Sequence, residues 1–222
     1  MGSMIRLNAS DKHEFLAYLS APEGPSKGGI VVIQEIFGVN SHIKEVTDRI
    51  ATAGYLAIAP ALFDRIETNI TLQYDDEGVS KERQFKDETD PNSELDVKAA
   101  LEHVRSAGNV AAIGFCWGGS LAWRVATDEA SGLAAAISYY GGELPSLSSR
   151  MVACPFMAHF GIHDGSIPEE GARAFASAQP MVDTYFYDAG HGFNCDHRSQ
   201  YDASAAQTAW DRSMTFFAKH MT

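Results

Sequence analysis

The sequence predicts an α/β fold with a mostly parallel central sheet and helices on both faces. Short apolar runs, which have the length of buried strands, alternate along the chain with longer segments of helical periodicity. Such alternation is typical of β-α-β units with right-handed crossovers. The expected strands are Glu14–Leu19, Gly29–Ile33, Leu56–Ala59, Val110–Phe115, Ala134–Tyr139, Pro155–Phe160 and Thr184–Tyr187.

Apolar residues at helical spacing predict the helices between these strands. Gly54 and Gly108 follow two of them, where glycine commonly ends a helix. The polar stretch Thr68–Asn92 is expected to be irregular, either as a lid over a site or as a surface excursion. The expected helices are His42–Ala53, Glu94–Ala107, a segment after Ile167, and Ala205–Lys219.

Composition indicates one domain, residues 1–222, because 222 residues with 45% hydrophobic content can form a single large core. The net charge of −12 argues against nucleic acid or an anionic membrane surface as partner. The sequence shows neither a secretion signal nor an apolar span, and its three cysteines lack a C-x-x-C pair. We therefore expect a cytoplasmic protein with free thiols, either a monomer or a weak homo-oligomer.

The segment Gly114-Phe115-Cys116-Trp117-Gly118 has the pattern of a nucleophile elbow with cysteine in place of serine. An apolar, strand-like run precedes it and a helix-like run follows. In such a turn the residues two positions from the nucleophile must be small, and the next backbone N–H faces the same point as the nucleophile. Cys116 is therefore the expected nucleophile; the alternative is a structural cysteine in the core.

A cysteine nucleophile needs a base, because an ordinary thiol is mostly protonated at neutral pH. In this class of fold the acid and the histidine follow the nucleophile in that order, each after a later strand. Asp164 and His191 occupy such positions, and glycines flank both. His191 would accept the thiol proton and Asp164 would orient the ring. Alone, these would be an ordinary turn residue and loop histidine, and His163 rivals Asp164 for a role in that loop.

A second informative stretch runs from Gly28 to Asn40, where a buried strand leads into a loop with Gln34 and Glu35. This loop and the residue after the nucleophile supply the oxyanion donors in such folds. We therefore expect the backbone N–H groups of Ile36 and Trp117 to form the oxyanion hole. Glu35 then lies near the thiol; alternatively it caps the following helix or forms a surface ion pair.

Three motifs together resemble the dienelactone hydrolase family, which has the α/β-hydrolase fold. They are Gln34-Glu35-Ile36-Phe37-Gly38, Gly114-Phe115-Cys116-Trp117-Gly118-Gly119 and Ala189-Gly190-His191-Gly192-Phe193. The resemblance spans nearly the whole chain. It implies a triad of Cys116, His191 and Asp164, and a glutamate, here Glu35, that interacts with the resting cysteine and helps to activate it when substrate binds.

The sequence departs from the family at the positions that bind a substrate carboxylate. That family has an arginine followed four residues later by tyrosine, and a second arginine four residues after the catalytic histidine. Here Arg83 is followed at that spacing by Asp87, and Cys195 stands four residues after the histidine. Arg83 and Arg198 remain the candidates for binding an anion.

The expected function is hydrolysis of a small ester or lactone through a thioester on Cys116, without a cofactor. Phe37, Tyr139 and Tyr140 are expected, with Trp117, to form pocket walls. Two alternatives are a binding module whose catalysis has lapsed and a thiol-redox protein that uses Cys116. No metal is expected, since the spacing of the Cys and His residues weighed as ligands matches no common zinc motif. Those residues are His159, His163, His191, Cys195 and His197.

Overall fold

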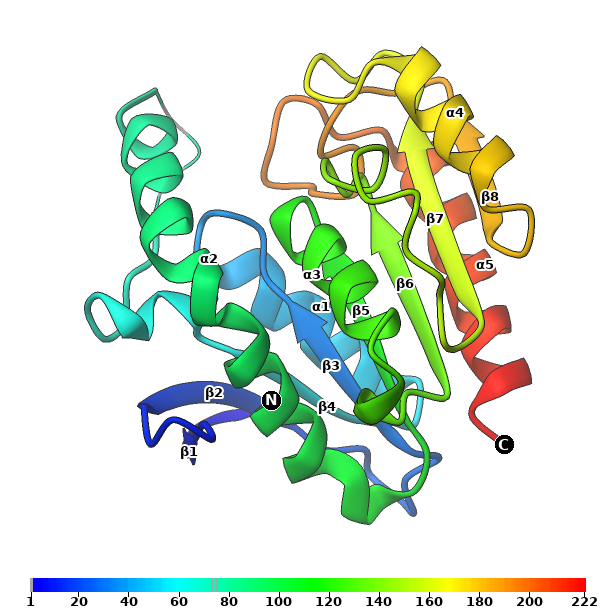
Figure 1. Ribbon diagram of the computed structural model, residues 1–222. Helices are drawn as coiled ribbons and strands as arrows, with labels where there is room; N and C mark the ends of the chain where they lie inside the picture. Colours follow the sequence, from blue (N-terminus) through cyan, green and yellow to red (C-terminus); the bar gives the residue numbers. More distant parts are fainter. Residues whose placement is uncertain (1, 73, 75) are drawn as a thin grey trace.

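The computed structural model describes residues 2–72, 74 and 76–222, with no side chain described between residues 75 and 83. The described residues form an eight-stranded sheet in the order β1-β2-β4-β3-β5-β6-β7-β8 (Figure 1). The strands are β1 (Ser3–Asn8), β2 (Glu14–Ser20), β3 (Gly29–Ile33), β4 (Leu56–Pro60), β5 (Val110–Phe115), β6 (Ala135–Tyr139), β7 (Phe156–Gly161) and β8 (Asp183–Tyr187).

The predicted fold class is confirmed, because β4, β3, β5, β6, β7 and β8 pair in parallel and helices cover both faces. Every residue of β3, β5, β6 and β7 is buried, which explains their continuous apolar sequences. Strand β1 was not predicted. It is a mostly exposed edge strand that pairs antiparallel with β2, so its sequence contains no apolar run.

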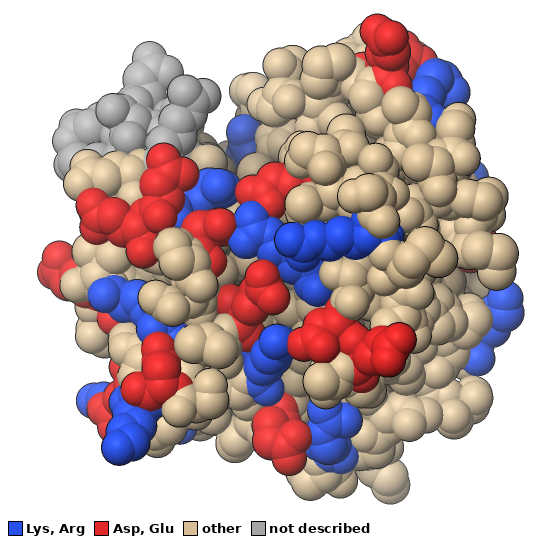
Figure 2. Space-filling model, viewed as in Figure 1, with Lys and Arg blue, Asp and Glu red and all other residues tan. Residues whose placement is uncertain are grey.

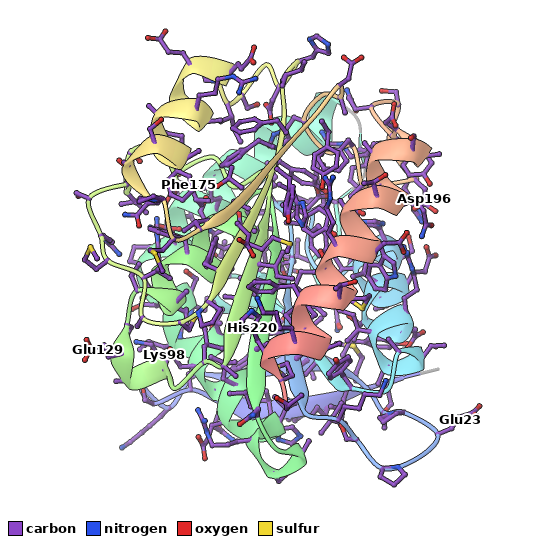
Figure 3. The ribbon with its side chains drawn as sticks, turned by 90° about the vertical axis from the view of Figure 1, so that its right-hand side faces the viewer. Glu23, Lys98, Glu129, Phe175, Asp196 and His220 are labelled. Carbon is purple, nitrogen blue, oxygen red and sulfur yellow. The ribbon has the colours of Figure 1, made fainter. Side chains whose placement is uncertain are left out.

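The helices lie in two layers. Helices α1 (Ser41–Thr52) and α5 (Ala203–His220) cover one face of the sheet. Helices α2 (Asp76–Val104), α3 (Trp117–Ala126) and α4 (Glu169–Ala178) cover the other face, and Figure 3 shows both layers from the side. The short 3₁₀ turns are Leu62–Arg65, Arg105–Ala107 and Glu129–Ser131.

Helix α2 corrects the prediction for Thr68–Asn92. That stretch was expected to be irregular, with a helix from Glu94, but the helix begins at Asp76 and contains Pro91. Between residues 84 and 96 the buried residues of this helix are polar, namely Thr89, Ser93 and Asp96. The guanidinium of Arg65 donates to both carboxylate oxygens of Asp96 at 2.7 Å. Because polar side chains make these contacts, the segment lacks the apolar periodicity that indicates an amphipathic helix.

Acidic and basic side chains are interspersed on the face that α2 and α3 cover, as Figure 2 shows. Several of them form ion pairs, such as Lys98 with Asp128 at 2.8 Å and Lys86 with Glu143 at 3.5 Å. Among the helices of the described residues, none has the length and apolar character that crossing a membrane requires.

Candidate active site

Cys116 lies in the sharp turn between β5 and α3. Its backbone angles are φ 53° and ψ −117°, a conformation that costs a non-glycine residue about 1–3 kcal/mol. The neighbouring glycines are sterically required. A Cβ atom on Gly114 would lie 1.9 Å from the carbonyl oxygen of Gly118, and a Cβ on Gly118 would lie 2.3 Å from that of Ile33. The turn therefore holds the sulfur at the carboxyl edge of the sheet.

The structure brings Cys116, His191 and Asp164 together. The His191 ring places Nε2 at 3.1 Å from the Cys116 sulfur and donates from Nδ1 to Oδ2 of Asp164 at 2.7 Å. The other carboxylate oxygen of Asp164 accepts the backbone N–H groups of Ser166 and Ile167, at 2.7 and 3.0 Å. The three side chains follow β5, β7 and β8, so the loops at one edge of the sheet hold the complete hydrogen-bonded series.

The surroundings of His191 favour its charged form. Burial opposes the charge, but the negative Cys116 sulfur and the hydrogen-bonded carboxylate of Asp164 outweigh it and raise the pKa of His191 to about 10. An imidazolium beside a thiolate is the form in which a cysteine–histidine pair is nucleophilic.

A pocket of about 290 Å³ opens above the Cys116 sulfur. Such a volume suits a small molecule and is at the lower end of ordinary ligand sites. The lining combines aromatic surface, backbone and a few charged groups. It is formed by Ile36, Phe37, Lys86, Cys116, Trp117, Ser120, Gly142, Glu143, Ser166, His191 and Arg198.

The two expected oxyanion donors, Ile36 and Trp117, both line this pocket. Within the described residues, neither backbone N–H has a hydrogen-bond acceptor. Trp117 is the first residue of α3, so its N–H belongs to the free, electropositive end of that helix. The two N–H groups can therefore donate hydrogen bonds to a negative oxygen beside the sulfur.

Glu35 is almost fully buried, and its described partner is Arg198 rather than Cys116. Oε1 of Glu35 lies 3.5 Å from Nη1 of Arg198, while Oε2 has no partner within the described residues. The Arg198 guanidinium also lies over the rings of Phe37 and Tyr74, with its carbon 5.3 and 5.7 Å from their centroids. Arg198 and Phe37 thus lie where substrate-binding residues were expected, on the wall of the pocket.

Tyr139 requires a correction. We expected it in the pocket wall, but it is fully buried in the core, and its hydroxyl lies 2.7 Å from the hydroxyl of Ser213 in α5. Tyr140 packs its ring 5.1 Å from that of His191 and has a positive φ of 40°, yet it is also fully buried. The side chain of Arg83 lies outside the described residues.

Residues that the sequence analysis did not select also contribute to the site. Lys86, from α2, lines the pocket. Asp90, one turn further along α2, accepts the indole N–H of Trp117 at 2.6 Å and a guanidinium N–H of Arg124 at 2.9 Å. In the sequence, the one indication that Lys86 and Asp90 belong to the site was that both lie in the polar stretch before Glu94. Helix α2 therefore supports the side of the pocket formed by Trp117.

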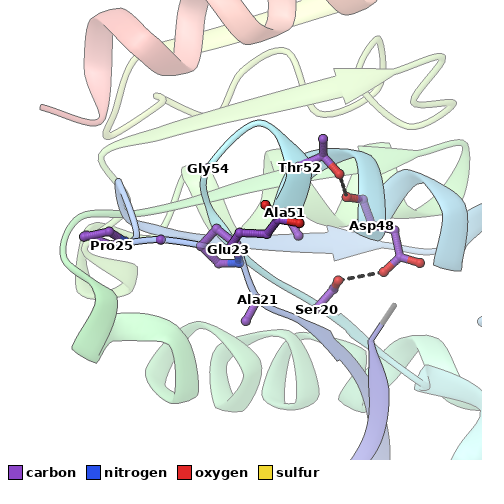
Figure 4. A pocket seen from close by; sticks show the side chains of 10 residues that line it. Ser20, Ala21, Glu23, Pro25, Asp48, Ala51, Thr52 and Gly54 are labelled. Atoms are coloured by element: carbon purple, nitrogen blue, oxygen red, sulfur yellow. Dashed lines mark hydrogen bonds between the residues drawn. The ribbon is translucent and has the colours of Figure 1, made fainter.

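Two other features lie outside this pocket. A hollow of about 640 Å³ lies at the amino end of the parallel strands, between the end of β2 and α1 (Figure 4). Separately, His42, Asp196 and His197 form a group of metal-ligating side chains next to α1. Of the five residues first weighed as metal ligands, only His197 belongs to this group.

Comparison with known proteins gives one consistent family. The model of the "Dienelactone hydrolase family" matches residues 15–221. A Synechocystis protein named as a candidate carboxymethylenebutenolidase is 34% identical, over 92% of this chain and 91% of its own length. The carboxymethylenebutenolidase of Pseudomonas putida is 32% identical, over 96% of this chain and 95% of its own.

A solved structure extends the likeness to three dimensions. A protein from Klebsiella pneumoniae, described as a candidate dienelactone hydrolase, matches with a TM-score of 0.81 and 27% identity, over 98% of both chains. The likeness therefore covers the sheet, both helix layers and the loops that carry Cys116, Asp164 and His191. On these grounds the chain belongs to the dienelactone hydrolase family.

Proposed function

We propose that this protein hydrolyses small carboxylic esters or lactones through a thioester formed on Cys116. The observation that carries the proposal is the hydrogen-bonded series from Asp164 through His191 to the Cys116 sulfur, at the base of a small pocket. The family and the carboxymethylenebutenolidase relatives support an ester or lactone hydrolase. A thiol paired with a charged histidine supplies the nucleophile that such a reaction needs.

In the first half of the reaction, the Cys116 sulfur attacks the carbonyl carbon of the substrate. The carbonyl oxygen gains the negative charge and accepts the N–H groups of Ile36 and Trp117. The C–O bond to the leaving group then breaks, and His191 gives its proton to the departing oxygen. In a lactone the leaving oxygen stays attached, so this step yields a ring-opened thioester.

In the second half, water replaces the sulfur. His191, now neutral, removes a proton from the water as its oxygen attacks the thioester carbonyl. The C–S bond breaks, the carboxylic acid leaves, and the thiolate is restored beside the imidazolium. Because a thiolate is itself a good leaving group, the mechanism suits esters with stabilised leaving groups better than amides.

Arg198 is our candidate for recognising an anionic group on the substrate. Its guanidinium lines the pocket, and burial against the Glu35 carboxylate keeps it in place beside the aromatic face of Phe37. Glu35 then has two roles in this proposal: it holds Arg198 in the free protein, and its charge acts close to the nucleophile.

We also propose that residues 1–222 act as one domain in the cytoplasm. All eight strands belong to the same sheet, which supports a single folding unit. The three cysteines are free thiols, which suits a reducing compartment.

The test is intact-protein mass spectrometry during turnover of p-nitrophenyl acetate and of a dienelactone. Wild type is compared with Cys116→Ala, and Cys154→Ala is the matched control, because Cys154 is a half-buried thiol outside the pocket. We expect an acyl adduct and product release that only Cys116→Ala abolishes. The ratio of the two substrates then reports whether an anionic group improves binding.

Two results would contradict the proposal. Equal slow hydrolysis by wild type and Cys116→Ala, without an adduct, would mean that Cys116 is a structural residue or that the protein is a binding module. Reversible sulfenic acid or mixed disulfide on Cys116 without ester cleavage would instead indicate a thiol-redox protein.

A further inference from the structure

A cluster of side chains that can bind a metal lies beside the pocket, where α1 meets the loop after β8. It consists of His42, near the start of α1, together with Asp196 and His197. One possible ligand atom from each of the three lies within 4.8 Å of the others. Figure 3 labels Asp196 near the amino-terminal end of α5, on the side of the molecule that α1 also occupies.

The spacing of these atoms fits a small cation better than hydrogen bonds. Oδ1 of Asp196 lies 3.4 Å from Nδ1 of His42 and 3.7 Å from Nε2 of His197. Good N–H···O bonds are about 2.7–3.2 Å long. Ligand atoms of a tetrahedral zinc ion, each about 2.0–2.2 Å from the metal, lie roughly 3.3–3.5 Å apart. The two distances from Asp196 are thus near the separation of two ligands on one zinc ion, and the three ligand atoms lie within 4.8 Å of one another.

The chemistry of the three groups favours zinc among the common divalent cations. Two imidazoles and a carboxylate are typical zinc ligands, whereas magnesium and calcium prefer oxygen alone. Nδ1 is the nitrogen of the His42 ring that faces Asp196, so it is the atom that would bind the metal. Glu45, one turn along α1, already places Oε2 at 3.0 Å from Nε2 of His197 and can approach a fourth position.

An independent observation is the unpaired nitrogen of His42. The side chain is 3% exposed, and its Nε2 is buried without a partner among the described residues. A metal on Nδ1 would fix the proton on Nε2. Ligating histidines commonly direct that second N–H toward a carboxylate. The negative charge of Glu35, whose Oε2 is also without a partner, acts on the His42 ring.

We propose that His42, Asp196 and His197 form a zinc site, with Glu45 available as a fourth ligand. The metal joins the start of α1 to the loop that carries Arg198, and through the His42 ring it adjoins Glu35. A hollow of about 660 Å³ lined in part by Lys44, Tyr74 and His197 gives the ion a path to the cluster. The site is separate from the cysteine nucleophile, so it does not depend on the proposed hydrolysis.

The test is isothermal titration of the chelator-treated protein with zinc sulfate, together with the absorption spectrum of the Co²⁺ form. Titrations use wild type and Cys116→Ala, because a catalytic thiol and histidine can themselves bind zinc. We expect one zinc per chain in the Cys116→Ala protein and a Co²⁺ spectrum of tetrahedral nitrogen and oxygen ligation. Zinc should also raise the melting temperature.

Substitutions locate the ion. His197→Gln changes a partly exposed side chain and should weaken zinc binding by more than about tenfold. Loss of a residue that only hydrogen-bonds to a zinc ligand already costs about tenfold, and loss of a ligand should cost more. His42→Gln should do the same if it folds. The matched control is His163→Gln, because His163 is exposed and pairs with Asp188. It follows β7, which two strands separate from β3, the strand before α1. Absence of stoichiometric zinc in the Cys116→Ala protein, or equal binding by His197→Gln, would overturn the proposal.

Discussion

The two ends of the sheet carry hollows of opposite character. At the amino end, the hollow of about 640 Å³ has paired polar groups: Asp48 accepts a hydrogen bond from Ser20 at 2.6 Å (Figure 4). Asp48 also accepts one from the hydroxyl of Tyr18 at 3.0 Å. At the carboxyl end, the pocket over Cys116 is less than half as large. Two residues that contact its lining have buried polar atoms without described partners: Glu35, which pairs with Arg198, and Tyr140, whose ring packs against His191.

Two residues with strained backbone also lie at the carboxyl end of the sheet. Cys116 and the fully buried Tyr140 both have positive φ angles, and each such residue costs about 1–3 kcal/mol. A fold tolerates strained backbone and unpaired polar groups where the surrounding structure fixes them, and such places are commonly functional. The comparison teaches that volume does not single out the candidate site in this molecule, whereas strained backbone and unpaired buried polar groups do.

The largest effect is expected from Asp164→Asn, which leaves the shape of the carboxyl end intact. The amide no longer fixes the tautomer of His191 or stabilises its charge, so kcat should fall by roughly 10⁴-fold. The same change removes two interactions that raise the pKa of His191, namely the hydrogen bond and the charge of the carboxylate. The ring should therefore lose its proton at a lower pH than in wild type, as histidine NMR titration can measure.

The control for this prediction is Asp188→Asn. Asp188 also pairs with a histidine, His163, but both are exposed and neither lines the pocket. We expect kcat to remain at the wild-type value. A comparable fall in both variants would show that the loops, rather than the His191–Asp164 bond, determine the rate.

A smaller effect, on stability, is expected from Arg198→Gln. This change leaves the Glu35 carboxylate buried without its cation, so the free energy of unfolding should fall by about 3 kcal/mol. Adding Glu35→Gln removes the isolated charge and should restore most of the loss. Denaturant unfolding of wild type, the two single variants and the double variant gives the coupling energy.

Arg173→Gln is the matched change in an exposed ion pair. Arg173 and Glu169 form an exposed ion pair within α4, which should contribute no more than about 0.5 kcal/mol. If the Arg198→Gln and Glu35→Gln effects simply add, the 3.5 Å contact between the two groups contributes little, and the contrast between the two ends of the sheet weakens.

The carboxyl end could be located from the sequence because its signals are local. The seven predicted strands are confirmed to within a few residues, and Cys116, Asp164 and His191 each follow one of them, with glycines at the close approaches. Parallel strands present their carboxyl ends at one edge, so three positions far apart in the chain had to meet there.

The sequence predictions failed for residues whose positions depend on long-range contacts rather than on the spacing of residues along the chain. Tyr139 and Tyr140 are adjacent aromatics at the end of β6, and nothing in the chain indicates that Tyr139 meets Ser213 in the core. The part of α2 before Glu94 was missed because its buried residues, Thr89 and Ser93, are polar. A long-range polar contact, such as that between Arg65 and Asp96, produces no periodic pattern in the sequence.

Ser20→Ala, at the amino end, should reduce stability less than Arg198→Gln does and leave activity unchanged. It removes one hydrogen bond to a charged group and leaves Asp48 with its bond to Tyr18, so the unfolding free energy should fall by about 1.5 kcal/mol. Since this end of the sheet contains no strained nucleophile and lies away from the pocket, kcat/KM should equal the wild-type value. Denaturant unfolding and ester hydrolysis on the same preparation measure both. A several-fold loss of kcat/KM would mean that the paired end of the sheet also determines the geometry at Cys116, and the division between a stabilising end and a reactive end would fail.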